Sequence, residues 1–305
     1  MLALLTLPTQ RPQIEAMTVA SHPAQMVDAG RHPHGTDALA SLLALRRPLV
    51  MGILNVTPDS FSDGGAFLDP GAAIAHAERM AAEGADIIDI GAESTRPYGN
   101  AKAVPAEEEL RRLAGVLPAV ARLGRATSID TMKASVAAWA IEQGAAIVND
   151  VWGLQRDADM AGIVARNRVG VIIMHNRAAA DPHIDILDDI EAFFARSLAV
   201  AGRAGVGRQA VILDPGIGFG KTPEQSMMVI AKLKRFQKFD LPLLVGASRK
   251  RFIETVAPAP PDRRLGGSIA AHVVAVLNGA RLVRTHDVAE TVQALRILAA
   301  IGARS

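Results

Sequence analysis

The chain has 305 residues, 50% of them hydrophobic and 21% charged, which suits one large domain or two ordinary ones and excludes global disorder. Lysine and arginine number 33 against 31 aspartates and glutamates, an excess too small to indicate nucleic-acid binding. The absence of cysteine excludes disulfides and thiolate metal sites.

No apolar run reaches the length of a membrane span, and no basic segment precedes the short apolar run at residues 1–7. We therefore expect a cytoplasmic protein that does not enter membranes.

The first 45 residues differ in composition from the rest. They contain scattered proline, glutamine, threonine and three histidines, with little periodicity before Ala38–Leu45. We interpret residues 1–45 as a loose N-terminal extension and residues 46–305 as a single domain. The three histidines (His22, His32 and His34) are interpreted as incidental rather than as metal ligands.

From Pro48 onward, short apolar runs alternate with amphipathic helical patterns. The predicted strands are Leu49–Leu54, Asp86–Ile90, Ala126–Ile129, Ala146–Asn149, Gly170–Met174, Ala210–Leu213, Leu243–Gly246 and Arg281–Thr285. The predicted helices lie near 71–83, 106–122, 133–143, 158–167, 186–204, 223–236, 262–278 and 288–300.

This alternation predicts a parallel sheet, because parallel neighbours need crossover connections. Eight strand–helix units over roughly 250 residues favour a TIM-like (β/α)8 barrel of the α/β class. An open, doubly wound sheet is the alternative.

Polar or charged side chains follow all eight predicted strands. They are Asn55; Glu93 with Thr95 and Arg96; Asp130; Asn149; His175; Asp214; Ser248 with Lys250; and Arg284 with His286. In a barrel these groups share the C-terminal rim, where active sites are built. We interpret His175 as a packed or hydrogen-bonded structural residue.

The loop from Asp214 to Thr222 is rich in glycine but matches neither common phosphate-binding motif. A Walker A loop would need glycine where Pro215 stands, and a dinucleotide fingerprint would need glycine where Lys221 stands. What remains is a carboxylate at a strand end and a flexible loop that can bring Phe219 over a ligand.

The rim groups indicate the chemistry of a ligand. Alone, each of Asp130, Asn149 and Asp214 could cap a helix, but together they favour a planar ligand with several N–H donors. Four cations follow the last two strands and indicate an anionic substrate: Arg249, Lys250, Arg284 and His286.

Seven motifs in order resemble one family, the dihydropteroate synthases, which are the pterin-binding enzymes of the folate pathway. The motifs are Asn55-Val-Thr-Pro-Asp-Ser-Phe-Ser-Asp-Gly-Gly, Glu93-Ser-Thr-Arg-Pro97, Ser128-Ile-Asp-Thr131, Asn149-Asp-Val, Asp214-Pro-Gly-Ile-Gly-Phe-Gly-Lys, Gly246-Ala-Ser-Arg-Lys and Arg284-Thr-His-Asp287. The resemblance runs from about residue 48 to 300.

The resemblance implies a transferase that joins 4-aminobenzoate to (7,8-dihydropterin-6-yl)methyl diphosphate. It implies pterin ligands at Asp130, Asn149, Asp214 and Lys250, and diphosphate contacts at Thr95, Arg284 and His286. It places the aminobenzoate among Phe61, Arg96, Pro97, Phe219 and Ser248, and a Mg²⁺ ligand at Asn55. It further implies a homodimer, in a family that is the target of sulfonamides.

Two rival functions share the same barrel, namely a corrinoid-linked methyltransferase and a non-catalytic pterin-binding paralogue. The methyltransferase would be expected to lack the 55–65 loop and the Thr-Arg-Pro segment, and the paralogue would be expected to lose Asn55, Arg96, Lys250 or Arg284. Tyr98 departs from the glycine usual in the family, so the second loop is expected to close differently.

Overall fold

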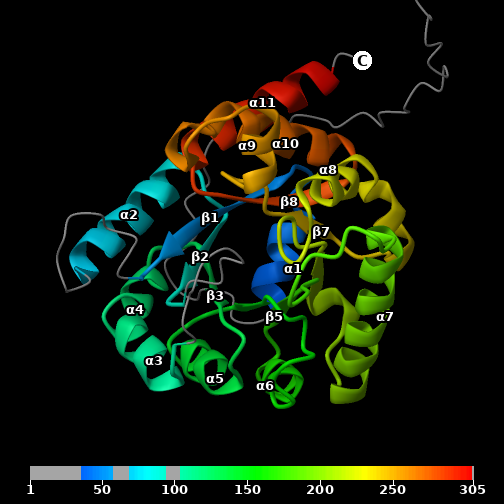
Figure 1. Ribbon diagram of the computed structural model, residues 1–305. Coiled ribbons are helices and arrows are strands. Elements are labelled where there is room, and N and C mark those ends of the chain that lie inside the picture. Colours follow the sequence, from blue (N-terminus) through cyan, green and yellow to red (C-terminus); the bar gives the residue numbers. More distant parts are fainter. Residues whose placement is uncertain (1–35, 58–68, 94–103, 304–305) are drawn as a thin grey trace, which may run out of the picture.

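The computed structural model describes residues 36–57, 69–93 and 104–303. Eight parallel strands close into a barrel in chain order (Figure 1), which confirms the predicted TIM-like fold. The strands are β1 Leu49–Asn55, β2 Ile87–Gly91, β3 Ala126–Asp130, β4 Ile147–Asp150, β5 Gly170–Met174, β6 Val211–Asp214, β7 Leu243–Val245 and β8 Ala280–Thr285.

Helices pack around the sides of the barrel, except the first, which lies at one of its ends (Figure 1). They are α1 Thr36–Ala44, α2 Pro70–Glu83, α3 Ala106–Ala114, α4 Leu117–Val120, α5 Ala134–Glu142, α6 Met160–Asn167, α7 Ile186–Ala204, α8 Pro223–Ala231, α9 Arg251–Val256, α10 Leu265–Leu277 and α11 Val288–Gly302. Within the described residues, three 3-10 helices are interspersed, at Arg208–Ala210, Leu233–Phe239 and Pro261–Arg263. Among the described residues, none of the helices combines the length and the apolar character that crossing a membrane requires.

Two predicted helices were wrong in extent, and two helices, α1 and α9, were not predicted. The predicted helix 106–122 is divided into α3 and α4 around Gly115, and the predicted helix 223–236 ends as an α-helix at Ala231. The short helix α9 follows β7 directly and was not predicted, because six residues carry too little periodicity to identify a helix.

The period of two along each strand divides the core into two layers. One side chain set faces the barrel interior and packs in a cluster with Leu39: Leu49, Met51, Ile87, Ile147, Ile172, Ile212, Leu244 and Leu282. The alternate set, which includes Val50, Ile88 and Val148, packs against the surrounding helices. The lower barrel is therefore filled with branched apolar side chains, as expected for this fold.

Helix α1 closes the N-terminal end of the barrel. Its Leu39 side chain is fully buried, and a Cβ atom at Gly170 would lie 2.9 Å from Leu39 Cδ2, so a larger residue there would force the Leu39 side chain to shift. The Thr36 N–H donates to the Arg168 carbonyl at 2.6 Å, and Arg281 Nη2 donates to the Leu43 carbonyl at 3.0 Å.

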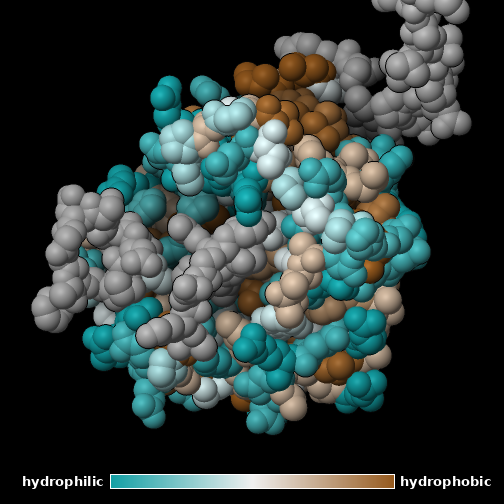
Figure 2. All heavy atoms as spheres, in the orientation of Figure 1, coloured by the Kyte–Doolittle hydropathy of each residue, from teal (hydrophilic) through white to brown (hydrophobic). Residues whose placement is uncertain are grey.

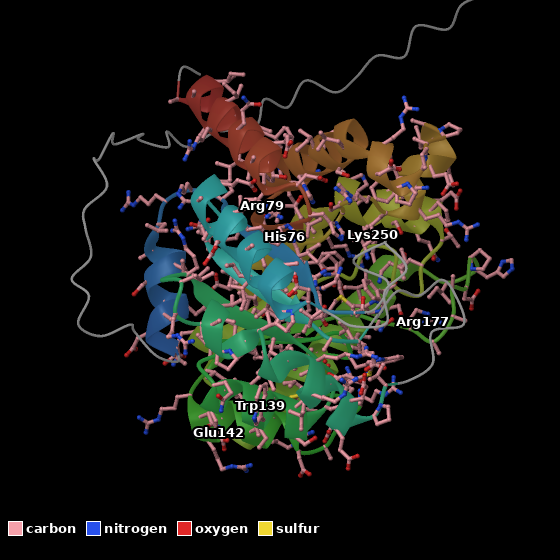
Figure 3. All side chains as sticks on the ribbon, turned by 90° about the vertical axis from the view of Figure 1, so that its left-hand side faces the viewer. His76, Arg79, Trp139, Glu142, Arg177 and Lys250 are labelled. Atoms are coloured by element: carbon pink, nitrogen blue, oxygen red, sulfur yellow. The ribbon has the colours of Figure 1, made fainter. Side chains whose placement is uncertain are left out.

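This helix corrects the predicted domain boundary. The predicted loose extension, residues 1–45, includes Thr36–Ala44, which fold as a helix against the barrel, so the packed region begins earlier than predicted. The three histidines of the extension lie outside the described residues. Figure 3 shows α1 toward one end of the barrel, with Lys250 and Arg177 toward the opposite end.

Candidate active site

The polar residues at the strand ends continue the interior-facing period of the apolar core. Asp89 stands two residues after Ile87, Asn149 two after Ile147, Asp214 two after Ile212 and Arg284 two after Leu282. In each strand, alternation therefore directs the polar side chain into the barrel mouth, directly above the apolar layer. Asp130 and Asn149 are also paired in register between β3 and β4.

Arg284 joins two buried carboxylates at the centre of the mouth. Its Nε donates to Asp89 Oδ2 at 2.6 Å, and its Nη2 donates to Asp130 Oδ2 at 2.8 Å. Asn149 Nδ2 donates to the same Asp89 oxygen at 3.0 Å. Asp89 is completely buried, so Arg284 neutralises a charge that would otherwise be isolated from water.

Asp89 was missed in the sequence prediction, and the structure assigns it a central position. It lies inside β2 rather than after it, so a search of strand ends passes over it. The available signal was a single carboxylate within an otherwise apolar run, at an interior-facing position.

Three buried acceptors at this site have no hydrogen-bond partner within the described part of the chain. They are Asp89 Oδ1, Asp130 Oδ1 and Asn149 Oδ1. Buried polar atoms are almost always paired in native proteins. A ligand that presents N–H donors to the barrel mouth would satisfy Asp130 and Asn149, which agrees with the donor-rich ligand that the sequence predicted.

Burial changes the pKa of both predicted pterin-binding carboxylates. It raises the pKa of Asp130 to about 7, with Arg284 opposing the rise and Asp89 adding to it. Burial also raises the pKa of Asp214 to about 6, against the N–H of Gly216, which donates to Asp214 Oδ1 at 2.7 Å.

Two pairs of predicted site residues, from the loops after β6, β7 and β8, are in contact. The Lys250 ammonium lies 4.1 Å from the centroid of the Phe219 ring, a cation–π contact. The Ser248 hydroxyl lies 3.0 Å from His286 Nδ1 and accepts the backbone N–H of His286 at 3.2 Å. The structure thus joins Ser248, predicted for the aminobenzoate, to His286, predicted for the diphosphate.

Asn55 ends β1 and is half-buried at the rim, opposite Gly91 of β2. Four further predicted site residues lie outside the described residues, as does Tyr98: Phe61, Thr95, Arg96 and Pro97.

Glu93 holds the two ends of the 94–103 segment together. Its Oε1 accepts the backbone N–H of Val104 at 3.0 Å, and its Oε2 accepts from Lys133 Nζ at 2.6 Å. Lys133 also pairs with the fully buried Glu109. Glu93 was predicted only as part of the rim, and its contacts with Val104 and Lys133 give it a structural role.

His175 is buried and hydrogen-bonded, as the sequence predicted. Its Nε2 lies 3.0 Å from Asp189 Oδ2, its Nδ1 lies 2.7 Å from Lys221 Nζ, and its ring makes an edge contact with Phe193. Lys221 stands out in the sequence only where it breaks a phosphate-binding motif, yet it is 2% exposed and belongs to this network.

The chain matches the family model described as "Pterin binding enzyme" over residues 51–286. It is 43% identical over 256 residues to dihydropteroate synthase from Bacillus subtilis, covering 84% of this chain and 89% of that protein. It is 40% identical over 270 residues to dihydropteroate synthase from Escherichia coli, covering 86% of this chain and 95% of that protein.

Solved structures agree with these relationships. Dihydropteroate synthase from Clostridium difficile, solved in the presence of pteroic acid, superposes with a TM-score of 0.80 at 45% identity, covering 84% of this chain and 97% of that one. The Xanthomonas albilineans enzyme, solved with 4-aminobenzoic acid, superposes with a TM-score of 0.80 at 43% identity, covering 84% and 94%. The chain therefore belongs to the dihydropteroate synthase family of pterin-binding enzymes, which are transferases of folate biosynthesis.

Proposed function

We propose that the protein condenses (7,8-dihydropterin-6-yl)methyl diphosphate with 4-aminobenzoate to give 7,8-dihydropteroate and diphosphate. The observation that carries this proposal is the set of buried acceptors around Arg284 in the barrel mouth. The related Xanthomonas albilineans enzyme, at 42% identity, has been solved in complex with 7,8-dihydropteroate, which supports the same product here.

The pterin ring is bound by Asp130, Asn149, Asp214 and Lys250. The amino-oxo edge of a pterin presents adjacent N–H donors, which suit a carboxylate such as Asp214. Asp214 Oδ1 already accepts from Gly216, but each carboxylate oxygen has two lone pairs and can accept again. The unpaired Oδ1 atoms of Asn149 and Asp130 supply further acceptors.

The diphosphate lies toward the ends of β7 and β8, near Arg284 and His286, with Thr95 from the second loop.

Mg²⁺ fits this site through Asn55, whose amide oxygen is a hard ligand at the rim. The described residues contain no group of three histidines or carboxylates that could hold a metal alone. In this proposal, water and substrate phosphate oxygens would supply the remaining ligands of the ion. When bound, Mg²⁺ would neutralise charge on the leaving group.

The reaction is a dissociative substitution at the methylene carbon of the pterin. The C–O bond breaks and the electron pair leaves with the diphosphate, where Arg284 and His286 offset the new charge. The carbon then carries positive charge delocalised into the pterin ring, which the Asp130 carboxylate stabilises. The arylamine lone pair forms the C–N bond and its proton is lost.

Positioning dominates the second step, because an arylamine is a weak nucleophile. Phe219 and Ser248 contribute to the aminobenzoate site beside Phe61, Arg96 and Pro97. Sulfonamides would occupy this same position, as supported by a Yersinia pestis relative of 40% identity that was solved as a sulfonamide drug complex.

Parallel measurement of diphosphate release and dihydropteroate formation tests the proposed function. We expect product only with both substrates and Mg²⁺, loss of activity on adding a chelator, and competition between a sulfonamide and 4-aminobenzoate. Tight pterin binding without product would favour the non-catalytic paralogue. Methyl transfer from methyltetrahydrofolate to a corrinoid would favour the methyltransferase.

Replacing Asp130 tests its proposed charge stabilisation. We expect Asp130→Asn to slow diphosphate release about 100-fold, the scale for losing one preorganised electrostatic contact. Because burial raises the pKa of Asp130 to about 7, its carboxylate forms only as pH rises through that value. The wild-type rate should therefore rise between pH 6 and 8, and the rate of Asp130→Asn should show no such rise.

The contribution of Asp130 to stability should depend on pH in the opposite direction from its contribution to the rate: it should decrease as pH rises. A carboxyl group whose pKa is raised on folding stabilises the protein below its unfolded pKa, and that contribution is lost as pH approaches 7. The wild type should therefore lose free energy of unfolding relative to Asp130→Asn from pH 4 to pH 7. Unchanged diphosphate release in Asp130→Asn would reject the proposed role.

We also propose that the protein forms a homodimer through an exposed apolar face on α9, α10 and α11. Figure 2 shows this patch at the top of the molecule. Its members are Val256 (68% exposed), Val274 (43%), Leu277 (54%), Ile297 (58%) and Ile301 (64%). Patches of this kind mark protein interaction sites.

The double replacement Ile297→Glu and Ile301→Glu is expected to give a monomer, because both side chains lie one helical turn apart on α11. Light scattering coupled to size-exclusion chromatography measures the mass. Leu45→Glu is the control, since Leu45 is 40% exposed but follows α1 and lies outside the three helices that carry the patch. A monomeric wild type would contradict the proposal.

A further inference from the structure

The loop between β6 and α8, residues 215–222, packs tightly against the end of β5. Gly216, Gly218 and Gly220 all have positive φ, at 66°, 81° and 55°. A Cβ atom at Gly216 would lie 2.0 Å from the His175 carbonyl oxygen, and one at Gly220 would lie 2.4 Å from Arg177 Cβ. The loop is therefore a fixed element of the site in this structure, despite the flexibility that its glycines suggest in the sequence.

Lys221 lies near the end of this loop, and its ammonium group contacts the backbone of the loop. Its Nζ donates to the Gly216 carbonyl at 2.8 Å and to the Phe219 carbonyl at 3.1 Å, and it lies 2.7 Å from His175 Nδ1. An ammonium group has three N–H donors, and these three acceptors match them. Burial lowers the pKa of Lys221 to about 7, while the charges of Asp214 and Asp189 oppose the fall.

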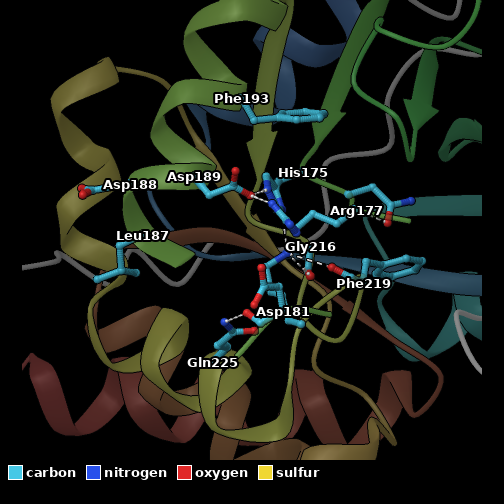
Figure 4. A network of polar contacts seen from close by, with 12 residues as sticks. His175, Arg177, Asp181, Leu187, Asp188, Asp189, Phe193, Gly216, Phe219 and Gln225 are labelled. Atoms are coloured by element: carbon cyan, nitrogen blue, oxygen red, sulfur yellow. Dashed lines mark hydrogen bonds and ion pairs between the residues drawn. The ribbon is translucent and has the colours of Figure 1, made fainter. Parts of the chain in front are cut away.

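The contact with Lys221 fixes the tautomer of His175. Because Nδ1 accepts from the ammonium, the ring proton lies on Nε2 and is donated to Asp189 Oδ2 at 3.0 Å. Arg177 Nη1 donates to the same carboxylate oxygen at 2.9 Å. Burial lowers the pKa of His175 to about 3, so the ring is neutral. Figure 4 shows His175 between Asp189 and Gly216 in this network.

Two predicted ligand-binding side chains depend on the positions that Lys221 holds. Gly216, whose carbonyl accepts from Lys221, donates its N–H to Asp214 Oδ1 at 2.7 Å. Phe219, whose carbonyl also accepts from Lys221, places its ring 4.1 Å from Lys250 Nζ. The backbone N–H of His175 donates to the Asp214 carbonyl at 2.8 Å, which ties the strand ends together.

We propose that Lys221 and His175 form a buried pin that positions Asp214 and Phe219 for the pterin, although neither residue of the pin need touch the substrate. The inference rests on the proposed function, because it takes Asp214 and Lys250 as pterin ligands. In this proposal, Lys221 and His175 contribute to folding and also raise the affinity for the pterin substrate by positioning its ligands.

Lys221→Met tests the pin by keeping the length and apolar stem of the side chain and removing its donors. We expect the KM for the pterin diphosphate to rise about tenfold, with a smaller change in kcat and in the KM for 4-aminobenzoate. Lys234→Met, which replaces an exposed lysine, is the matched control and should leave all three unchanged. A lowered melting temperature with an unchanged pterin KM would overturn the positioning role.

Two replacements of His175 separate its two hydrogen bonds and remain decisive if Lys221→Met does not fold. His175→Asn keeps an acceptor near the position of Nδ1 for Lys221 and loses the bond to Asp189. His175→Gln keeps a donor near the position of Nε2 for Asp189 and loses the acceptor. We expect His175→Gln, but not His175→Asn, to reproduce the tenfold rise in pterin KM.

The double variant Lys221→Met/His175→Gln should have the same pterin KM as Lys221→Met, because the Lys221–His175 bond that His175→Gln removes is already absent in Lys221→Met. Equal effects of His175→Asn and His175→Gln on KM would overturn the pin. A wild-type protein that forms no dihydropteroate would instead reject the proposed function, so the two failures are distinguishable.

Discussion

Arg284→Met is expected to lower the free energy of unfolding by about 3–5 kcal/mol, the usual cost of removing one partner from a buried ion pair. Arg284 neutralises Asp89, whose side chain is 0% exposed, and Asp130, which is 7% exposed. Without the guanidinium, the two carboxylates would face each other across the barrel mouth. Dihydropteroate formation should also fall below detection, since the same side chain is proposed to contact the leaving diphosphate.

Chemical denaturation with two matched variants measures this effect. Arg111→Met removes a surface ion pair in which the arginine is 70% exposed, and should cost less than about 1 kcal/mol. Adding Asp89→Asn to Arg284→Met removes one of the two uncompensated charges and should recover part of the lost stability, without restoring activity. Equal destabilisation by Arg284→Met and Arg111→Met would show that Arg284 does not hold the two carboxylates.

Asp214→Asn is expected to weaken pterin binding about 100-fold, because hydrogen bonds to charged groups are worth roughly 1.5–3 kcal/mol each. The replacement has the same shape, and its amide oxygen can still accept the N–H of Gly216, which now bonds Oδ1 at 2.7 Å. Its NH₂ group would then face the N–H edge of the pterin, so that donor meets donor. The fold should remain intact while affinity is lost.

Titration calorimetry with the pterin diphosphate, in the absence of 4-aminobenzoate, measures this affinity directly. Asp240→Asn is the control, because Asp240 precedes β7 at the opposite end of the barrel and has a φ of 50°, which asparagine also tolerates. Unaltered affinity in Asp214→Asn would remove Asp214 from the pterin site.

The alternation of apolar and polar residues determined both the barrel and most of its rim. Most of the β-strands are short apolar runs that end in a polar residue or are followed directly by one, and a period of two fixes which side chains face inward. The sequence alone could therefore place Asn149 and Asp214 in one mouth, since each follows an interior isoleucine by two positions. The motif spacing then identified the family.

The partners of these residues were decided only by the tertiary structure. Asp89 and Arg284 are 195 residues apart, and the closure of β1 against β8 brings them to hydrogen-bonding distance. Lys221 and His175 are separated by 46 residues, and the sequence alone did not indicate that one would donate to the other. Helix α1 was hidden for the same reason, because its stability comes from Leu39 packing beneath the barrel.

One physical reason separates the features that the sequence determined from those that only the tertiary structure decided. Periodicity and strand ends are local properties, written in neighbouring residues, so the sequence by itself determined the strands, their inward faces and the chemical character of the rim. Hydrogen bonds and desolvation depend on which segments meet in space. Only the closed barrel therefore decided which carboxylates share Arg284, which pKa values are raised by burial, and which lysine holds the β6–α8 loop.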